Sequence, residues 1–112
     1  MTATNRQSIA AALSTLDGIE GYPKRPDVLG EGVAWPLIRA VNRGPGQAFQ
    51  TTWRVIVLLS SDEDTAYDQL DGFLVTVPDA LQAVLYVDTI TPTAITTDAG
   101  DLFGFELIAR SE

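Results

Sequence analysis

The chain has 112 residues, 46% of them apolar, and its seven Lys and Arg against fifteen Asp and Glu give a net charge of -8. This length and apolar content suit one folded domain and exclude a disordered tail. The negative charge argues against a surface that neutralises nucleic-acid phosphates or anionic lipids. Because the sequence has no Cys and no His, disulfides, thiol nucleophiles, thiolate zinc sites and the commonest general base are also excluded.

The first predicted element is an amphipathic helix over about residues 5–17. Thr4 and Gln7 have the three-residue spacing of a capping box, and apolar residues from Ile9 onward recur at helical spacing until Gly18. Residues 18–27 follow, with two prolines that impose extended geometry. We expect this segment to form an edge strand or a strap that leads into a loop.

The next predicted element is a long antiparallel hairpin. Residues 33–42 alternate as a strand that Pro36 restricts to an edge or a bulge, and residues 47–59 give the strongest strand pattern of the chain. Between them lies the turn sequence Arg-Gly-Pro-Gly. The distal part of the hairpin, residues 39–52, is more polar than its base. We expect it to project beyond the domain, as hairpins that pair with a neighbouring subunit do.

A second helix is predicted to start at Ser60, which has capping-box spacing to Glu63. Pro78 is expected to kink or break this helix before a last stretch to about Ala83. Residues 85–97 and 102–110 alternate on either side of a turn, which predicts a second hairpin. The predicted fold class is therefore α+β, a mainly antiparallel β-sheet with two α-helices packed on one face, in the order helix, hairpin, helix, hairpin, within a single domain.

The charged residues are divided unevenly along the chain. Residues 1–57 carry a net charge of about +2 and residues 58–112 about -10, counted from the sequence. Such halves suit head-to-tail self-contact or an acidic wall, whereas the alternative is that the acids are simply solvated. The candidate interface residues are Arg39, Arg43, Phe49 and Arg54, and the candidate acidic face is Asp62, Glu63, Asp64, Asp68 and Asp71.

No segment has the pattern of a catalytic, metal or cofactor site. The acidic run 62–64 and the pair Asp98 and Asp101 lack the spacing of a calcium loop and fit helix capping and a turn better. The glycine-rich segments 30–32 and 44–46 lack the Lys and the following helix of a phosphate loop. Lys24 or a carboxylate would have to activate any Ser or Thr nucleophile. We therefore expect no enzyme, no cofactor and no metal.

Two further features bear on partners and location. Trp35, Phe49 and Trp53 are either core residues or interface anchors, and the central strand position of Trp53 favours the core. The longest apolar run, residues 55–59, is too short to span a bilayer, and the N-terminal residues lack an export pattern. We expect a soluble protein of the cytoplasm with no membrane partner.

From Gly21 onward, a series of short motifs occurs in an order and spacing that resemble one protein family. The motifs are Gly21-Tyr22-Pro23, Arg25-Pro26-Asp27, Trp35, residues 52–57, residues 85–88, residues 97–102 and Arg110-Ser111-Glu112. They resemble the small tail terminator proteins of long-tailed, siphovirus-type bacteriophages that infect high-GC Gram-positive hosts.

This resemblance implies a structural virion protein at the tail–neck junction, assembled in the host cytoplasm. Such proteins form a ring, usually a hexamer, that caps the last ring of tail-tube protein and ends its polymerisation. The ring also offers a surface to the head–tail connector or head-closure protein. The genome DNA then passes through the lumen without specific binding, which an acidic wall would favour.

Two alternatives stay open at this point. One is another small neck, head-closure or tail-completion protein of similar size, which position in the virion would separate from a terminator. The other is an acidic binding or inhibitor module that mimics nucleic acid and binds a basic partner. The second alternative predicts a monomer or dimer with a continuous acidic stripe.

Overall fold

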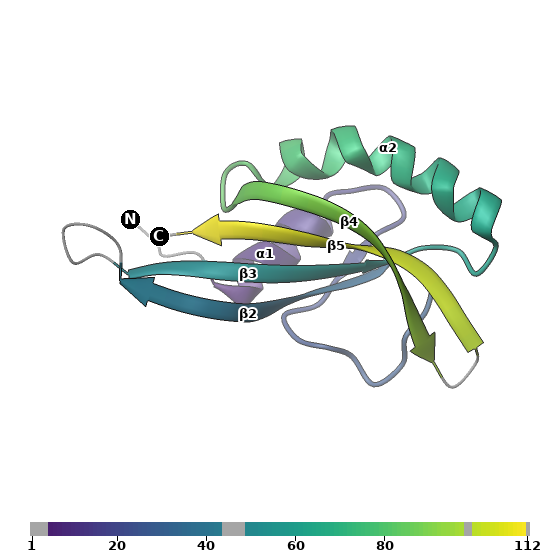
Figure 1. The fold of residues 1–112 in the computed structure, drawn as a ribbon, viewed down its shortest axis with the longest axis horizontal. Coiled ribbons are helices and arrows are strands. Elements are labelled where there is room, and N and C mark those ends of the chain that lie inside the picture. Colours follow the sequence, from purple (N-terminus) through teal and green to yellow (C-terminus); the bar gives the residue numbers. More distant parts are fainter. Residues whose placement is uncertain (1–4, 44–48, 98–99, 112) are drawn as a thin grey trace.

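The structure is a computed structural model that describes residues 5–43, 49–97 and 100–111, without the side chains at positions 42, 43 and 49. It contains a mixed, mostly antiparallel sheet of five strands and two helices, which confirms the α+β class (Figure 1). The elements are α1 (Arg6–Leu13), β1 (Glu20–Gly21), β2 (Val33–Arg43), β3 (Phe49–Leu58), α2 (Glu63–Leu81), β4 (Tyr86–Thr97) and β5 (Gly100–Ser111). The molecule is elongated, with extents of 47 × 27 × 21 Å.

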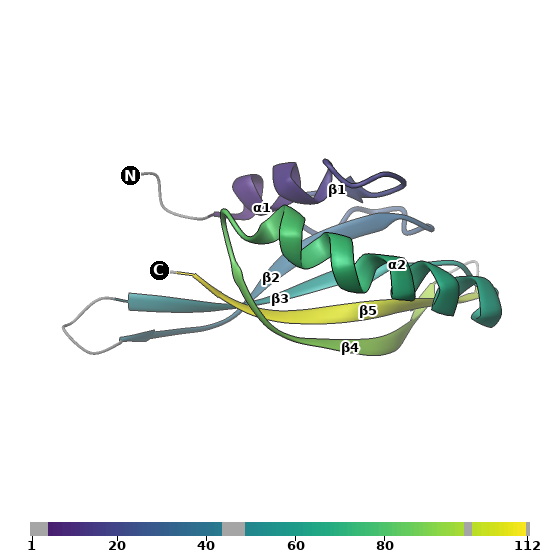
Figure 2. The same cartoon turned by 90° about the horizontal axis from the view of Figure 1, so that it is seen from above.

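The strands are ordered β1-β2-β3-β5-β4 across the sheet. β1 pairs with β2 in parallel over two residues. Residues 18–27, which we expected to form an edge strand or a strap, therefore contain a very short edge strand. β2–β3 and β4–β5 form the two antiparallel hairpins, and β3 pairs with β5 in the centre. Both helices lie on the same side of the sheet (Figure 2). We call this side the covered face and the other side the open face.

β4 is an edge strand, and β1 pairs with only the first two residues of β2. Each of these two strands, β2 and β4, has a proline at a position where its missing N–H costs no hydrogen bond. The N–H of Tyr22 donates to the carbonyl of Ala34 at 2.8 Å, so the backbone polar groups of Ala34 face β1 rather than β3. Because these groups alternate in direction along a strand, the backbone nitrogen of Pro36 also faces away from β3. The same alternation, followed across β3 and β5, directs the backbone nitrogen of Pro92 in β4 away from β5. β2 and β4 also contain one bulge each, at Arg39 in β2 and at Asp88 in β4. Prolines and bulges limit unwanted pairing of strand edges.

The main core lies between the two helices and the covered face. Phe105 of β5 is fully buried there, and its ring centroid lies 6.0 Å from that of Phe73 of α2. Trp53, 3% exposed, also belongs to this core, which confirms the interpretation favoured for it. Other buried members of the cluster are Ile9, Leu13, Ile19, Ala34, Val55, Val57, Leu59, Ala66, Leu70, Val77, Leu81, Leu85, Leu107 and Ala109.

A smaller cluster lies on the open face at the end of the sheet nearest β1. Trp35, Ile56 and Leu58 are buried there, and Tyr22 and Leu29 from the loop before β2 pack against them. The guanidinium of Arg25, in the same loop, lies 5.9 Å from the centroid of the Trp35 ring. Trp35 is therefore a core residue of this subunit rather than an exposed anchor.

The first helix begins at a different capping box from the predicted one. Asn5 is the N-cap: its side chain accepts a hydrogen bond from the N–H of Ser8, and the Ser8 hydroxyl accepts one from the N–H of Asn5, both at 2.9 Å. The prediction of a box ending at Gln7 is wrong by one residue, and Thr4 lies outside the described residues. The helix ends at Leu13, because turns that lead to Gly18, at φ 80, replace its expected last turn.

The second helix also differs from its prediction at two points. Asp62 rather than Ser60 is the N-cap, since it accepts from the N–H of Thr65 at 3.0 Å, while the Ser60 hydroxyl accepts from the N–H of Asp62 at 3.1 Å. The sequence predicts a kink or a break at Pro78 before a last stretch to about Ala83. The helix continues through Pro78 to Leu81, so a break is wrong. A proline removes one hydrogen bond, and the burial of Val77 and Leu81 on either side of it holds this turn in place.

Two glycines allow close contacts between α1, β1 and β2. A Cβ at Gly21 would collide with the carbonyl oxygen of Ala10, so the absence of a side chain there lets α1 approach β1. Gly32 has φ 87, a conformation that disfavours other residues, and a Cβ there would collide with the carbonyl of Gly18.

Candidate interaction surfaces

The predicted projecting hairpin is the end of the molecule formed by the distal parts of β2 and β3 (Figure 1). β5 accompanies β3 as far as the pair Thr51–Ser111. Among the described residues, positions 42, 43, 49 and 50 extend beyond this last pair with the third strand. Arg39 lies at the β2 bulge with an exposed side chain. Arg43 and Phe49 form the last described pair of the hairpin, and their side chains and the turn at 44–46 lie outside the described residues.

Arg54, the fourth candidate interface residue, is engaged within the chain. It projects from β3 on the open face, and its Nε lies 2.9 Å from Oε1 of Glu106 on β5. The Nε–H is not aimed at this oxygen, so the contact is an ion pair, and Nε is buried without a hydrogen-bond partner among the described residues. The guanidinium end reaches solvent, since the side chain is 42% exposed. Only part of the Arg54 side chain is therefore available to contact a residue of another subunit.

A second ion pair lies beside it on the open face. Arg110 donates two hydrogen bonds to Asp88, from Nε at 2.8 Å and from a terminal nitrogen at 2.9 Å. These bonds raise the pKa of Arg110, and the charge of Asp88 adds to the effect. The guanidinium also lies 4.8 Å from the centroid of the exposed Tyr86 ring. The β4 bulge at Asp88 supplies this carboxylate, which the sequence pattern did not indicate.

The candidate acidic face lies on and before α2. The Thr65 hydroxyl donates to an Asp62 carboxylate oxygen at 2.7 Å, and this hydrogen bond has the larger effect in lowering the pKa of Asp62. The hydrogen bond from the Thr65 N–H lowers it further. The other members occupy exposed positions along the helix, and no described Lys or Arg forms an ion pair with them. Three of them recur at helical spacing on the outward side, namely Asp64, Asp68 and Asp71. They form one exposed acidic stripe.

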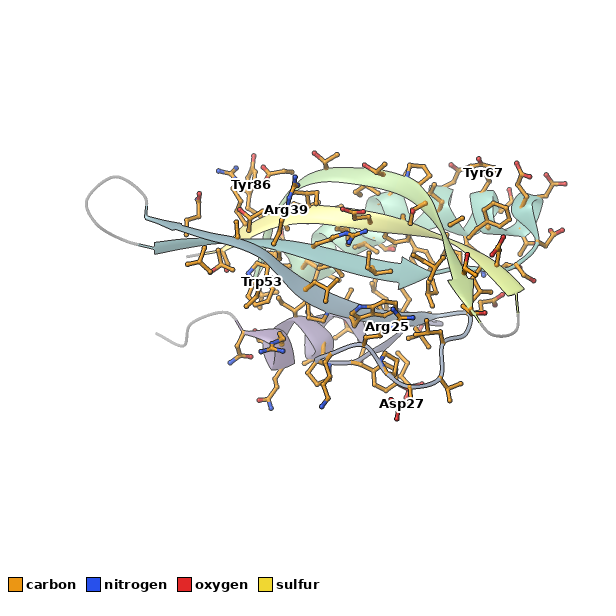
Figure 3. The ribbon with its side chains drawn as sticks, turned by 60° about the horizontal axis from the view of Figure 1, so that its bottom comes forward. Arg25, Asp27, Arg39, Trp53, Tyr67 and Tyr86 are labelled. Atoms are coloured by element: carbon orange, nitrogen blue, oxygen red, sulfur yellow. The ribbon has the colours of Figure 1, made fainter. Side chains whose placement is uncertain are left out.

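An apolar groove, which we call the α2–β4 groove, lies beside this stripe. It is lined by Ala66, Tyr67 and Leu70 of α2, by residues 92–94 of β4, and by Leu59, Phe103 and Gly104 beneath them. Its volume is about 190 Å³. Figure 3 shows Tyr67, on its rim, far along the molecule from Arg39.

A larger open recess of about 600 Å³ lies between α2 and the turn after α1. Asp17, Glu31 and Asp68 line it, together with several glycines and apolar side chains. Within the described parts of the chain, no three acidic side chains come together as metal ligands would. None of the helices in the described ranges is long and apolar enough to cross a membrane.

Sequence reasoning missed the exposed apolar side chains near the bulge of β2. Ile38 and Val41 are 50% and 53% exposed, and Tyr67 and Val75 of α2 are 50% and 68% exposed. The prolines in β2 and β4 were the available signal for open strand edges, because a proline is tolerated in a sheet where no N–H donor is needed.

The chain matches no family model, and no curated protein or solved structure is similar to it at a significant level.

Proposed function

We propose that this chain is a structural virion protein that forms a ring, caps the tail tube of a long-tailed phage and ends tube polymerisation. Its partners are further copies of itself, the tail-tube protein and a head–tail connector or head-closure protein. It assembles in the host cytoplasm and resides at the tail–neck junction. No catalysis, cofactor or membrane contact is part of this function.

The observation that carries the proposal is the separation of charge along an elongated molecule. Residues 33–57, which form the β2–β3 hairpin, contain three Arg and no acidic residue, whereas residues 55–109 contain ten acidic residues and no Lys or Arg. The distal hairpin and the first half of α2 lie toward opposite ends of the long axis (Figure 1). Two different, oppositely charged ends allow head-to-tail contacts, which close into a ring when the rotation between subunits permits.

The arrangement of the elements supports the same function. The resemblance implies a sheet with helices on one side, and the residue patterns predict the order helix, hairpin, helix, hairpin. Here α1, the β2–β3 hairpin, α2 and the β4–β5 hairpin follow one another, with the short β1 inserted after α1. Both helices contribute to one core against the covered face.

The acidic stripe of α2 suits the passage of DNA. Its carboxylates are exposed and lack basic partners among the described residues, so a lumen wall built from them would repel phosphates. We therefore assign the outward side of α2, at Asp64 and Asp68, to the wall of the channel.

The first test is the absolute mass of the purified protein by light scattering across concentration and salt, beside negative-stain images of mixtures with assembling tail-tube protein. We expect either a ring of about six subunits or a smaller species that caps tubes and shortens them. A protein that neither self-associates nor changes tube length contradicts the proposal.

A charge-reversed variant ties this assembly to the hairpin. Replacing Arg39 and Arg43 with Glu should weaken the ring and increase the protein concentration needed for tube capping. The matched control replaces Arg6 and Lys24 with Glu, which changes the net charge equally but lies on α1 and in the loop after β1. An unchanged mass for the hairpin variant would argue against this interface.

The acidic binding module remains the second candidate, because the acidic stripe of α2 is the feature that it requires. This candidate predicts a monomer or dimer that ignores tail tubes and binds a basic protein in a salt-sensitive way. Another neck or tail-completion protein would form a ring but bind the connector rather than the tube end. The same two measurements separate all three.

A further inference from the structure

We propose that the α2–β4 groove receives the side chains of Ile38 and Val41 from a second copy of this chain, with Arg39 beside them against the acidic rim. This inference rests on the proposed self-assembly and names the two surfaces that meet. It adds to that function a defined head-to-tail contact.

The groove has the size and chemistry for aliphatic side chains. Apolar residues of α2, β4 and β5 form most of its lining, and Leu59 and Leu70 within it are almost fully buried. Its volume of about 190 Å³ compares with an apolar cavity of about 150 Å³ that holds a benzene ring. One or two aliphatic side chains would therefore fill it.

The bulge in β2 places a matching pair of side chains on one face. Residues three apart on a regular strand point to opposite faces. Because Arg39 is the extra residue of the bulge, Ile38 pairs with Trp53 and Val41 pairs with Thr51, and both lie on the covered side of the sheet. Each is half exposed, so the covered face is incompletely covered at these two positions.

The charges around the two surfaces are complementary. On α2, Glu63 and Asp71 lie one helical turn before and after Tyr67, so acidic side chains flank the rim of the groove. On β2, the exposed Arg39 lies between the two aliphatic residues in sequence, and the segment around it has no acidic residue. Opposite charges beside an apolar contact favour this orientation over hairpin-to-hairpin or groove-to-groove pairing.

A subunit cannot fill its own groove with its own hairpin. Arg39 and Tyr67 lie far apart along the molecule (Figure 3), and the rigid sheet between them holds them apart. Side-chain insertion is also favoured over strand addition here, because Pro92 in the groove wall removes an outward-facing N–H donor from β4.

The natural absence of cysteine permits a clean cross-linking test. One variant carries Val41→Cys on the hairpin, and a second carries Ala94→Cys in the groove wall. The control replaces the second with Val28→Cys, which is 81% exposed in the loop before β2. Each pair is mixed at concentrations where light scattering shows assembly, and a short bis-maleimide links thiols that lie close together.

We expect a covalent dimer from the Val41→Cys and Ala94→Cys mixture and none from the control mixture or from Val41→Cys alone. Val41→Asp should raise the protein concentration needed for half-assembly by about tenfold or more. Arg39→Glu should weaken assembly, and adding Asp71→Lys to the same chain should partly restore it. Assembly with tube capping but without this cross-link overturns the inference and leaves the proposed function standing. If no variant or parent assembles or caps tubes, the proposed function itself fails.

Discussion

The two faces of the sheet are built from different side chains, although the same strands supply both. On the covered face β5 places Phe105 and Leu107, which are fully buried beneath the helices. On the open face it places Glu106, Ile108 and Arg110, which are partly exposed and include both ion-pair residues of the strand. Most of the buried apolar side chains thus lie on the covered face, which leaves the part of the open face outside the Trp35 cluster available for contacts.

Neighbouring residues of β5 give the sharpest test of this difference. Leu107→Ala should lower the free energy of unfolding by about 2–5 kcal/mol, because it leaves a cavity in the main core. Ile108→Ala, one residue later on the open face, should cost about 1 kcal/mol or less. Urea unfolding of both variants measures this directly, and equal losses would show that the two faces contribute alike.

Close packing of α1 on the covered side provides the next test. Gly21→Ala forces a methyl group against the carbonyl of Ala10, and the displaced helix should cost about 2 kcal/mol. Gly30→Ala is the matched control, because nothing lies within 4 Å of a Cβ at that position. If both variants unfold at the same urea concentration, α1 tolerates the shift and the close approach is not needed.

A buried hydrogen bond joins two strands of the covered face near the hairpin. Trp53 Nε1 donates to the Ser111 hydroxyl at 2.7 Å, so Ser111→Ala leaves a buried donor unpaired and should cost about 1.5 kcal/mol. The same substitution in a Trp53→Phe background should be nearly neutral, because the donor is already gone. Additive losses in this double-mutant cycle would rule out the bond as the cause.

The smallest effect concerns the start of the helix that covers the sheet. Hydrogen bonds from Thr65 lower the folded-state pKa of Asp62 below its ordinary value of 3.8. The contribution of Asp62 to stability is therefore complete above pH 3.8 and is lost as the pH falls through the lower, folded-state pKa. Asp62→Asn keeps the acceptor but does not titrate, so its stability should fall less steeply with acid below pH 3.8. Identical pH profiles for the two proteins would contradict this.

Much of the fold follows from local patterns in the sequence. The strong alternation of residues 47–59 and of residues 102–110 corresponds to the central strands β3 and β5. Helix boundaries were less predictable, because several polar residues near each start have capping-box spacing and only the three-dimensional path of the chain selects one. Asn5 and Asp62 are the caps in the structure, whereas sequence spacing favoured Thr4 and Ser60.

The candidate surfaces were predictable in charge but not in geometry. Counting charges separates a basic hairpin from an acidic second half, and the structure places Arg39 and Asp68 at exposed positions. It also pairs Arg54 with Glu106 inside the subunit. That pairing depends on β3 and β5 being neighbours, which is a long-range property that no local pattern specifies.

The sequence by itself determined the α+β class, the two hairpins and the separation of charge, because these depend on residue type and on spacing along the chain. Only the tertiary structure decided that β5 lies between β3 and β4, that the bulge at Arg39 brings Ile38 and Val41 to one face, and that an apolar groove lies between α2 and β4. These features depend on strand order and register, which packing between distant segments selects.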